Sequence, residues 1–115
     1  MKLFIAGIIA SALLTTSYSA IADTSSDTIA LVKSTNADCL QCHKIEKKLI
    51  GPAWKDVAAK YKADPTAQSL LVEKVIKGGK GHWDDQTGGY PMTPHPTKPT
   101  REELEKIIAL ILQIQ

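Results

Sequence analysis

The chain has 115 residues, and its formal net charge of +2 is the small difference between 14 basic and 12 acidic side chains. This length supports one domain, with an apolar core too small to be strongly stable unaided. The near balance of charges excludes the large basic excess that is typical of nucleic-acid-binding proteins. Electrostatic attraction to a partner must therefore come from local patches of charge.

The first 22 residues are typical of an export signal. Lys2 gives a positive start, residues 3–14 are apolar, and residues 20–22 (Ala-Ile-Ala) have the small-x-small pattern of a cleavage site. An uncleaved anchor is the alternative, but about 12 apolar residues are fewer than the ~20 that a spanning helix needs. We therefore predict a cleaved signal peptide at 1–22, export to the periplasm, and one domain at 23–115 that does not span the membrane.

A first helix is predicted to begin at Ser25 or Ser26, either of which can cap it, and to end near Lys33. Ile29 and Val32 fall on one face of this helix. We expect that face to point inward.

Two further helices are predicted in the middle of the chain. Gly51-Pro52 breaks the chain before a short helix at 53–60, and Asp64-Pro65 starts a helix that stops at Gly78-Gly79. The apolar stripes of the two helices are Trp54, Val57, Ala58 and Tyr61, and Leu71, Val72, Val75 and Ile76. Their helical spacing indicates that each helix buries one face.

Residues 77–99 are rich in Gly, Pro and Thr, so we expect a long loop, and such loops are usually functional or disordered. After the loop, Thr100 and Glu103 have the spacing of a capping box. A stripe at helical spacing follows, formed by Leu104, Ile107, Ile108, Ile111 and Ile114. Because no segment alternates like a strand, the predicted fold class is all-α, with four to five short helices.

The segment Cys39-Leu40-Gln41-Cys42-His43 has the C-x-x-C-H form that marks covalent haem attachment. Asn36-Ala37-Asp38 can initiate a helical turn, on which residues three apart share a face. Both thiols could then form thioethers with the two vinyl groups of one porphyrin. His43 would supply a neutral imidazole as the first axial ligand of the iron.

Other interpretations of the two cysteines are weaker. A thioredoxin-like pair normally lies in a βαβ pattern, and a structural zinc site needs further Cys or His residues at ligand spacing. A plain disulfide suits an exported protein but leaves His43 unexplained. We therefore predict one haem c, bound covalently through Cys39 and Cys42. The porphyrin would also give the short helices a common centre to pack on.

The second axial ligand is predicted to be Met92, the one Met that follows the export signal. Flanking prolines restrict the backbone of Tyr90-Pro91-Met92-Thr93-Pro94, and a Met sulfur favours ferrous iron. A gap-filling core Met is the alternative, and a Met between prolines fits it poorly. His82 and His95 are rival ligands, although a polar loop role is expected for each. With both axial positions filled, electron transfer is the chemistry left to the iron.

In chain order, these features resemble the small class I monohaem c-type cytochromes of the bacterial cytochrome c-551 family. The matching landmarks are the haem motif, Ile50-Gly51-Pro52-Ala53-Trp54-Lys55-Asp56-Val57-Ala58, Lys77-Gly78-Gly79 with Trp83, Pro91-Met92-Thr93-Pro94 and a terminal helix. The resemblance implies a small cytochrome c fold around one haem with His and Met ligation. It also implies that the Pro52 carbonyl accepts a hydrogen bond from His43, and that Trp83 lies beside a haem propionate. The segment between Trp83 and Met92 is longer than the usual family loop.

The predicted function is therefore electron transfer without catalysis, by a monomer that docks transiently with periplasmic redox proteins and binds no nucleic acid. Lysines near the haem motif could steer an acidic partner or be ordinary solvated side chains. They are Lys44, Lys47, Lys48, Lys55, Lys60 and Lys62. A peroxidase-like haem enzyme with an open distal position is one alternative. A dedicated cytochrome subunit of a dehydrogenase or oxidase is the other.

Overall fold

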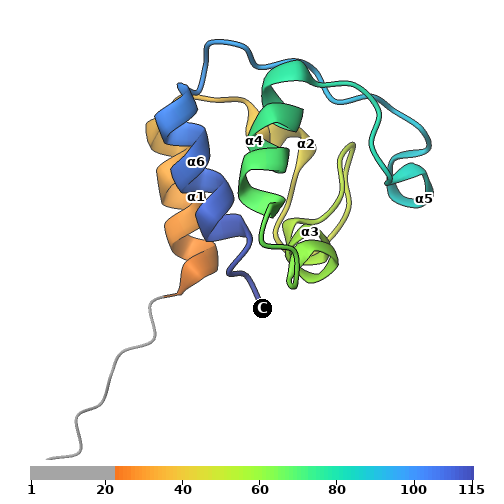
Figure 1. The fold of residues 1–115 in the computed structure, drawn as a ribbon, viewed down its shortest axis with the longest axis horizontal. Helices are drawn as coiled ribbons and strands as arrows, with labels where there is room; N and C mark the ends of the chain where they lie inside the picture. The colour runs from red at the N-terminus through yellow and green to blue at the C-terminus, as the bar shows by residue number, and fades with distance from the viewer. Residues whose placement is uncertain (1–22) are drawn as a thin grey trace, which may run out of the picture.

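The computed structural model describes residues 23–115, so the predicted signal peptide at 1–22 lies outside the described residues. Within 23–115 the chain forms helices and no β-strand (Figure 1). The helices are α1 (Thr24–Ser34), α2 (Cys39–Cys42), α3 (Trp54–Tyr61), α4 (Ala67–Lys77), α5 (Asp84–Thr87) and α6 (Arg101–Ile111). The prediction of an all-α fold is confirmed. None of these helices combines the length and the apolar character needed to cross a bilayer.

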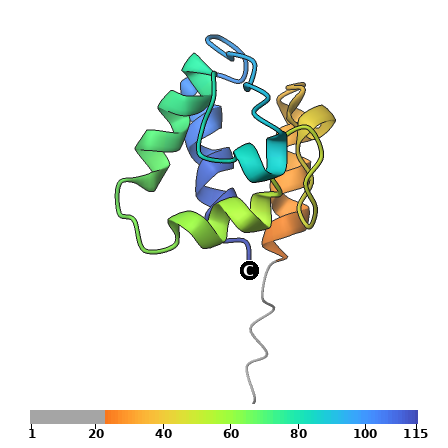
Figure 2. The same cartoon turned by 90° about the vertical axis from the view of Figure 1, so that its right-hand side faces the viewer.

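The core lies where α1 and α4 pack against α6, and α3 crosses one end of this layer (Figure 2). The predicted stripes supply its buried side chains, which are Val32, Trp54, Val57, Ala58, Leu71, Val72, Leu104, Ile107, Ile108, Ile111 and Ile114. Ile29, Tyr61, Val75 and Ile76 are only half-buried and lie at the edge of this cluster. Periodicity therefore identified the inward faces, and packing decided which members are fully buried.

Side chains cap the N-termini of both α1 and α6, but only the cap of α6 is the predicted one. Thr100 accepts a hydrogen bond from the Glu103 backbone, and the Glu103 side chain accepts one from the Thr100 backbone, so the capping box of α6 is confirmed. The cap predicted for α1 was wrong, because Asp23 caps this helix and accepts hydrogen bonds from both Ser25 and Ser26. A carboxylate at this position satisfies orphan donors and also favours the positive end of the helix dipole.

The start of α4 also differs from the prediction. The helix begins at Ala67, because the Asp64 carboxylate accepts hydrogen bonds from both the backbone N–H and the hydroxyl of Thr66, at 2.8 and 2.7 Å. Asp64-Pro65-Thr66 is therefore a turn that precedes the helix.

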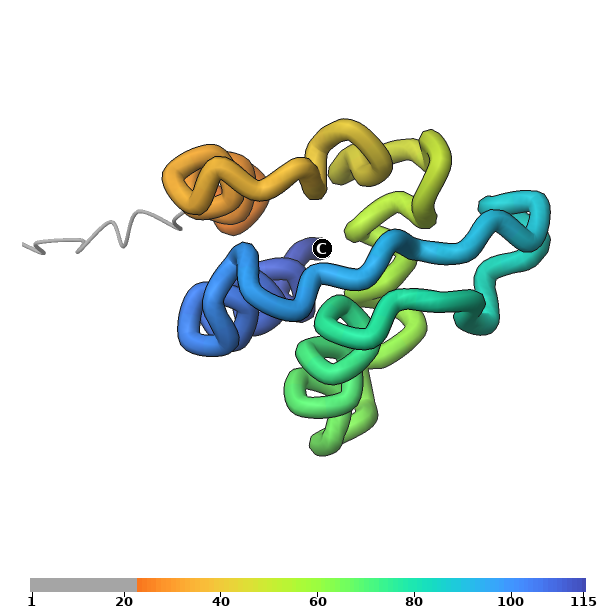
Figure 3. The backbone as a smooth tube through the Cα atoms, turned by 90° about the horizontal axis from the view of Figure 1, so that it is seen from above, coloured from red at the N-terminus to blue at the C-terminus, as the bar shows by residue number. Residues whose placement is uncertain are grey.

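The segment between α4 and α6 is mostly irregular, as predicted, but it contains one helical turn, α5, that was not predicted. Gln86 and Thr87 donate backbone hydrogen bonds to the Trp83 carbonyl, and Gly88 ends the turn in the left-handed region with φ 62°. Seen from above (Figure 3), this segment and residues 36–53 extend in the same direction, away from α1 and α6. The two segments carry all the predicted site residues.

Candidate haem site

Helix α2 positions the two thiols of the motif. Cys39 and Cys42 are its first and last residues, three apart on a single turn, and so share one face. Both are half-buried and neither is in a disulfide, which removes the disulfide alternative for this structure. Burial raises the pKa of the Cys39 thiol above its ordinary value, so this sulfur is protonated at neutral pH. Among residues 23–115, no group of three or more His, Cys, Asp or Glu side chains could hold a metal ion, so a structural zinc site at these thiols lacks further ligands.

His43 follows α2 in extended backbone conformation, and its ring contacts Pro52 and Trp54. Its Nδ1 lies 2.8 Å from the Pro52 carbonyl oxygen. Because a carbonyl oxygen can only accept, Nδ1 carries the proton, and the lone pair of Nε2 is left for a metal. The Trp54 ring stacks on the imidazole, with 5.6 Å between ring centres and 20° between planes. The ring is thus held in both orientation and tautomer.

The charge state of His43 also suits a ligand. Burial lowers its pKa below the ordinary value, the nearby charge of His95 lowers it further, and the hydrogen bond to Pro52 opposes these effects. The imidazole is therefore neutral at neutral pH, which is the form that binds iron.

Gly51 allows the backbone to come this close to the imidazole. A Cβ atom at this position would lie 2.5 Å from His43 Cε1 and 2.9 Å from both ring nitrogens. The Gly51 N–H donates to the Cys42 carbonyl at 2.7 Å, which ties this approach to the end of α2. Gly51 was identified from the sequence as a chain break and as part of a family landmark, but this contact was not predicted.

Met92 lies in a segment that runs antiparallel to the residues just after α4. Met92 and Gly79 exchange two backbone hydrogen bonds, of 2.8 and 3.0 Å. Gly78, at φ 65°, packs so closely that a Cβ would lie 2.6 Å from both the Met92 carbonyl oxygen and the Pro94 nitrogen. The two glycines predicted as a helix stop therefore also seat the loop that carries Met92.

Three other residues of this loop differ in their surroundings. Trp83 is half-buried at the edge of the core, with Lys60 Nζ 4.6 Å from its ring centre. His82 is exposed, as expected of a polar loop residue. His95 differs from that expectation, because its Nδ1 is buried and has no hydrogen-bond partner among residues 23–115. Its backbone N–H donates to the Val75 carbonyl of α4. Nothing in the sequence around His95 signalled its burial.

These residues fit a haem. One segment contributes two free thiols on one face and a neutral imidazole with an available Nε2. The other segment contributes Met92 and the unpaired Nδ1 of His95, which lies close enough to affect the pKa of His43. Leaving a buried polar atom unpaired costs about 1–3 kcal/mol, so this nitrogen indicates a partner outside the polypeptide.

Comparison with known proteins decides the family. Residues 32–115 match the family model described as Cytochrome c. The chain is a cytochrome c. It is 42% identical over 82 residues to the cytochrome c-551 of Allochromatium vinosum, covering 71% of this chain and 82% of that protein. It is 38% identical over 77 residues to the cytochrome c-552 of Hydrogenobacter thermophilus, covering 67% and 72%.

The fold of this cytochrome c agrees with that of a solved relative. The crystal structure of wild-type Nitrosomonas europaea cytochrome c552 matches it with a TM-score of 0.64 at 33% identity, covering 76% of this chain and 99% of that one. The predicted resemblance to class I monohaem cytochromes and the predicted haem c are confirmed. The cytochrome is therefore an electron-transfer protein with one covalently bound haem.

Proposed function

We propose that this cytochrome c is a periplasmic electron carrier in which Cys39 and Cys42 form the thioethers and His43 and Met92 are the axial ligands. The observation that carries the proposal is the hydrogen bond from His43 Nδ1 to the Pro52 carbonyl, which leaves Nε2 for iron. When bound, the haem would supply one iron centre that alternates between the ferrous and ferric states.

The polypeptide would keep both axial ligands in place while the electron moves. Pro52, Trp54 and Gly51 restrict the His43 ring, and the Gly79 bridge restrains the backbone of Met92. Rigid ligands keep the structural rearrangement on electron transfer small. With both positions filled, small molecules have no open coordination site, which favours a carrier over a peroxidase-like enzyme. We also propose that Trp83 lies beside a haem propionate.

Residues 44–50 are the part of the surface proposed to meet redox partners. Leu49 and Ile50 are 48% and 51% exposed, and Lys44, Lys47 and Lys48 beside them are exposed. Apolar contact surrounded by positive charge suits transient docking with an acidic partner. Lys55 is less available to a partner, because it forms an ion pair of 3.2 Å with Glu46. Raising the salt concentration should therefore slow electron transfer to such a partner.

The ligation is tested by replacing Met92 with Ala. We expect the ferric wild type to show a sulfur-to-iron charge-transfer band at long wavelength, and Met92→Ala to lose it while keeping the haem. His82→Ala is the matched control and should keep the band. Rapid carbon monoxide binding by the reduced wild type at neutral pH would contradict the proposal and favour the enzyme alternative.

Export and oligomeric state need a separate measurement. We expect the periplasmic product to begin at Asp23 and to have the mass of residues 23–115 plus one haem. Size-exclusion chromatography should show a monomer. A product that co-purifies at a stoichiometric ratio with a dehydrogenase or oxidase would instead identify a dedicated subunit.

A further inference from the structure

The loop that carries Met92 contributes little to the apolar core. None of the residues 78–98 is among the buried hydrophobic side chains, and Trp83 only reaches the edge of the cluster. Near α4 the loop is attached by the backbone bonds of Gly79 and His95. Segments with few buried apolar contacts open locally at low free energy. The far end of the loop must therefore be held by contacts of another kind.

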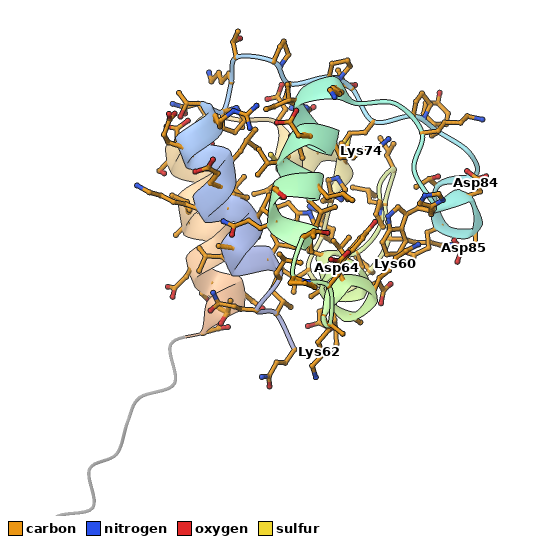
Figure 4. All side chains as sticks on the ribbon, viewed as in Figure 1. Lys60, Lys62, Asp64, Lys74, Asp84 and Asp85 are labelled. Carbon is orange, nitrogen blue, oxygen red and sulfur yellow. The ribbon has the colours of Figure 1, made fainter. Side chains whose placement is uncertain are left out.

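Two such contacts come from Lys60 on α3. Its Nζ lies 4.6 Å from the centre of the Trp83 ring and donates a hydrogen bond of 3.1 Å to the His82 carbonyl. Figure 4 shows Lys60 in the region between α3 and the loop that contains α5. One ammonium group thus contacts two consecutive residues of the loop, through a cation–π interaction and a charge-assisted hydrogen bond.

A third contact lies one turn away on the same face of α3. The Gln86 side-chain amide donates to the Asp56 carboxylate at 3.1 Å. Asp56 and Lys60 are four residues apart, so both project from one side of the helix. We call these three contacts the α3–α5 clasp: Lys60 contacts Trp83 and the His82 carbonyl, and Asp56 accepts from Gln86.

We propose that the α3–α5 clasp is a positioning device that keeps Met92 on the ferric iron. The proposal rests on the proposed ligation by Met92. A Met sulfur favours ferrous iron, so the ferric form is the state in which this ligand is most easily displaced. An external ligand can bind only after the loop opens, and its apparent affinity rises in proportion to the open population. Weakening the clasp should therefore strengthen the binding of an external ligand.

The test is an imidazole titration of the ferric holoprotein. Lys60→Leu removes both contacts of the ammonium group, and we expect it to increase the apparent imidazole affinity about 3- to 10-fold. Lys60→Arg keeps a cation over the Trp83 ring, so its apparent imidazole affinity should be within about twofold of the wild-type value. Lys62→Leu is the matched control, because Lys62 follows α3, is exposed and takes part in neither ion pair of residues 23–115. The imidazole affinity of Lys62→Leu should equal that of the wild type.

Several outcomes would overturn the proposal. An imidazole affinity of Lys60→Leu within about twofold of the wild-type value would contradict it. An equal increase in the imidazole affinity of Lys62→Leu would also contradict it, because the effect would then come from the loss of a positive charge alone. If Lys60→Leu does not yield holoprotein, Gln86→Ala tests the contact with Asp56, and an unchanged imidazole affinity would again contradict the clasp. The charge-transfer band is recorded before each titration. Its absence from the wild type would refute the ligation by Met92 itself, whereas its presence with unchanged affinities would refute only the clasp.

Discussion

His43 is held by three neighbours that lie outside the C-x-x-C-H motif. Pro52 sets the tautomer through its carbonyl, Trp54 stacks on one face of the ring, and Gly51 leaves the space that a side chain would fill. The motif alone places an imidazole beside the two cysteines. These neighbours decide where that imidazole points and which nitrogen is available.

Replacing Gly51 with Ala should displace the His43 ring, because the new Cβ would overlap its atoms. We expect a loss of stability of about 1–3 kcal/mol, typical of overpacking, and a several-fold lower yield of holoprotein. Chemical denaturation and the haem content of purified protein measure these effects. Gly81→Ala is the control, because its Cβ would be 3.4 Å from Trp83 and 3.6 Å from Lys74. Equal stability of both variants would contradict the steric argument.

Among the helices, local signals set where each one begins and ends, but not all signals have equal weight. The Thr100 capping box of α6 formed as its spacing predicted. At α1 the charged Asp23 caps the helix, instead of Ser25 or Ser26. At α4 the Asp64 side chain forms a turn with Thr66, so the helix begins at Ala67, two residues after Asp64-Pro65. In the two misjudged cases an aspartate carboxylate accepts the nearby hydrogen bonds.

Thr100→Ala should destabilise the protein by about 1 kcal/mol, because it leaves a backbone N–H at the start of α6 without its acceptor. Thr97, which is exposed in the preceding loop, offers a control of the same residue type. Urea denaturation of the two Ala variants gives the comparison. A Thr97→Ala variant as unstable as Thr100→Ala would argue against the cap.

The turn at Asp64 should make a pH-dependent contribution to stability. Hydrogen bonds from the side chain and then the backbone of Thr66 lower the pKa of Asp64 from 3.8. Because the folded-state pKa is the lower one, this contribution is present above pH 3.8 and is lost as the pH falls through the folded-state value. Asp64→Asn keeps an oxygen acceptor but cannot titrate. The stability of wild type relative to Asp64→Asn should therefore decline in acid, and a difference that does not vary with pH would exclude this linkage.

At the scale of the whole molecule, α6 joins the other long helices, since α1, α3 and α4 all contact it. Leu104 is 2% exposed at the centre of this packing, whereas Leu70 on α4 is 48% exposed. The buried cluster is small, and two of the helices have only four residues each. A covalently bound haem would therefore add the apolar surface that this small core lacks.

Leu104→Ala should cost about 2–5 kcal/mol, because it removes buried methyl groups and leaves a cavity at the contact of the long helices. Leu70→Ala changes the same atoms at the surface and should cost less than about 1 kcal/mol. Thermal or urea denaturation of the holoproteins measures both. Similar losses for the two variants would mean that α6 does not organise the core.

The double variant Cys39→Ala, Cys42→Ala has neither thioether-forming thiol, so it should not attach haem covalently. We expect this polypeptide to have much less helix than the wild-type holoprotein. Far-ultraviolet circular dichroism of the purified product provides the measurement, with the wild-type holoprotein as reference. Retention of wild-type helicity and cooperative unfolding by the haem-free variant would show that the core is sufficient on its own.

The linear pattern of residues was sufficient for the all-α class, the inward faces of the long helices, the capping box at Thr100 and the haem motif at Cys39, Cys42 and His43. Each of these depends on spacings of three or four residues, which the chain displays directly. Folding alone established the approach of Gly51 to His43, the contact of Lys60 with Trp83 and the burial of the Nδ1 atom of His95. These features depend on contacts between different segments of the folded chain. The local spacing of residues does not determine which residues meet in such contacts.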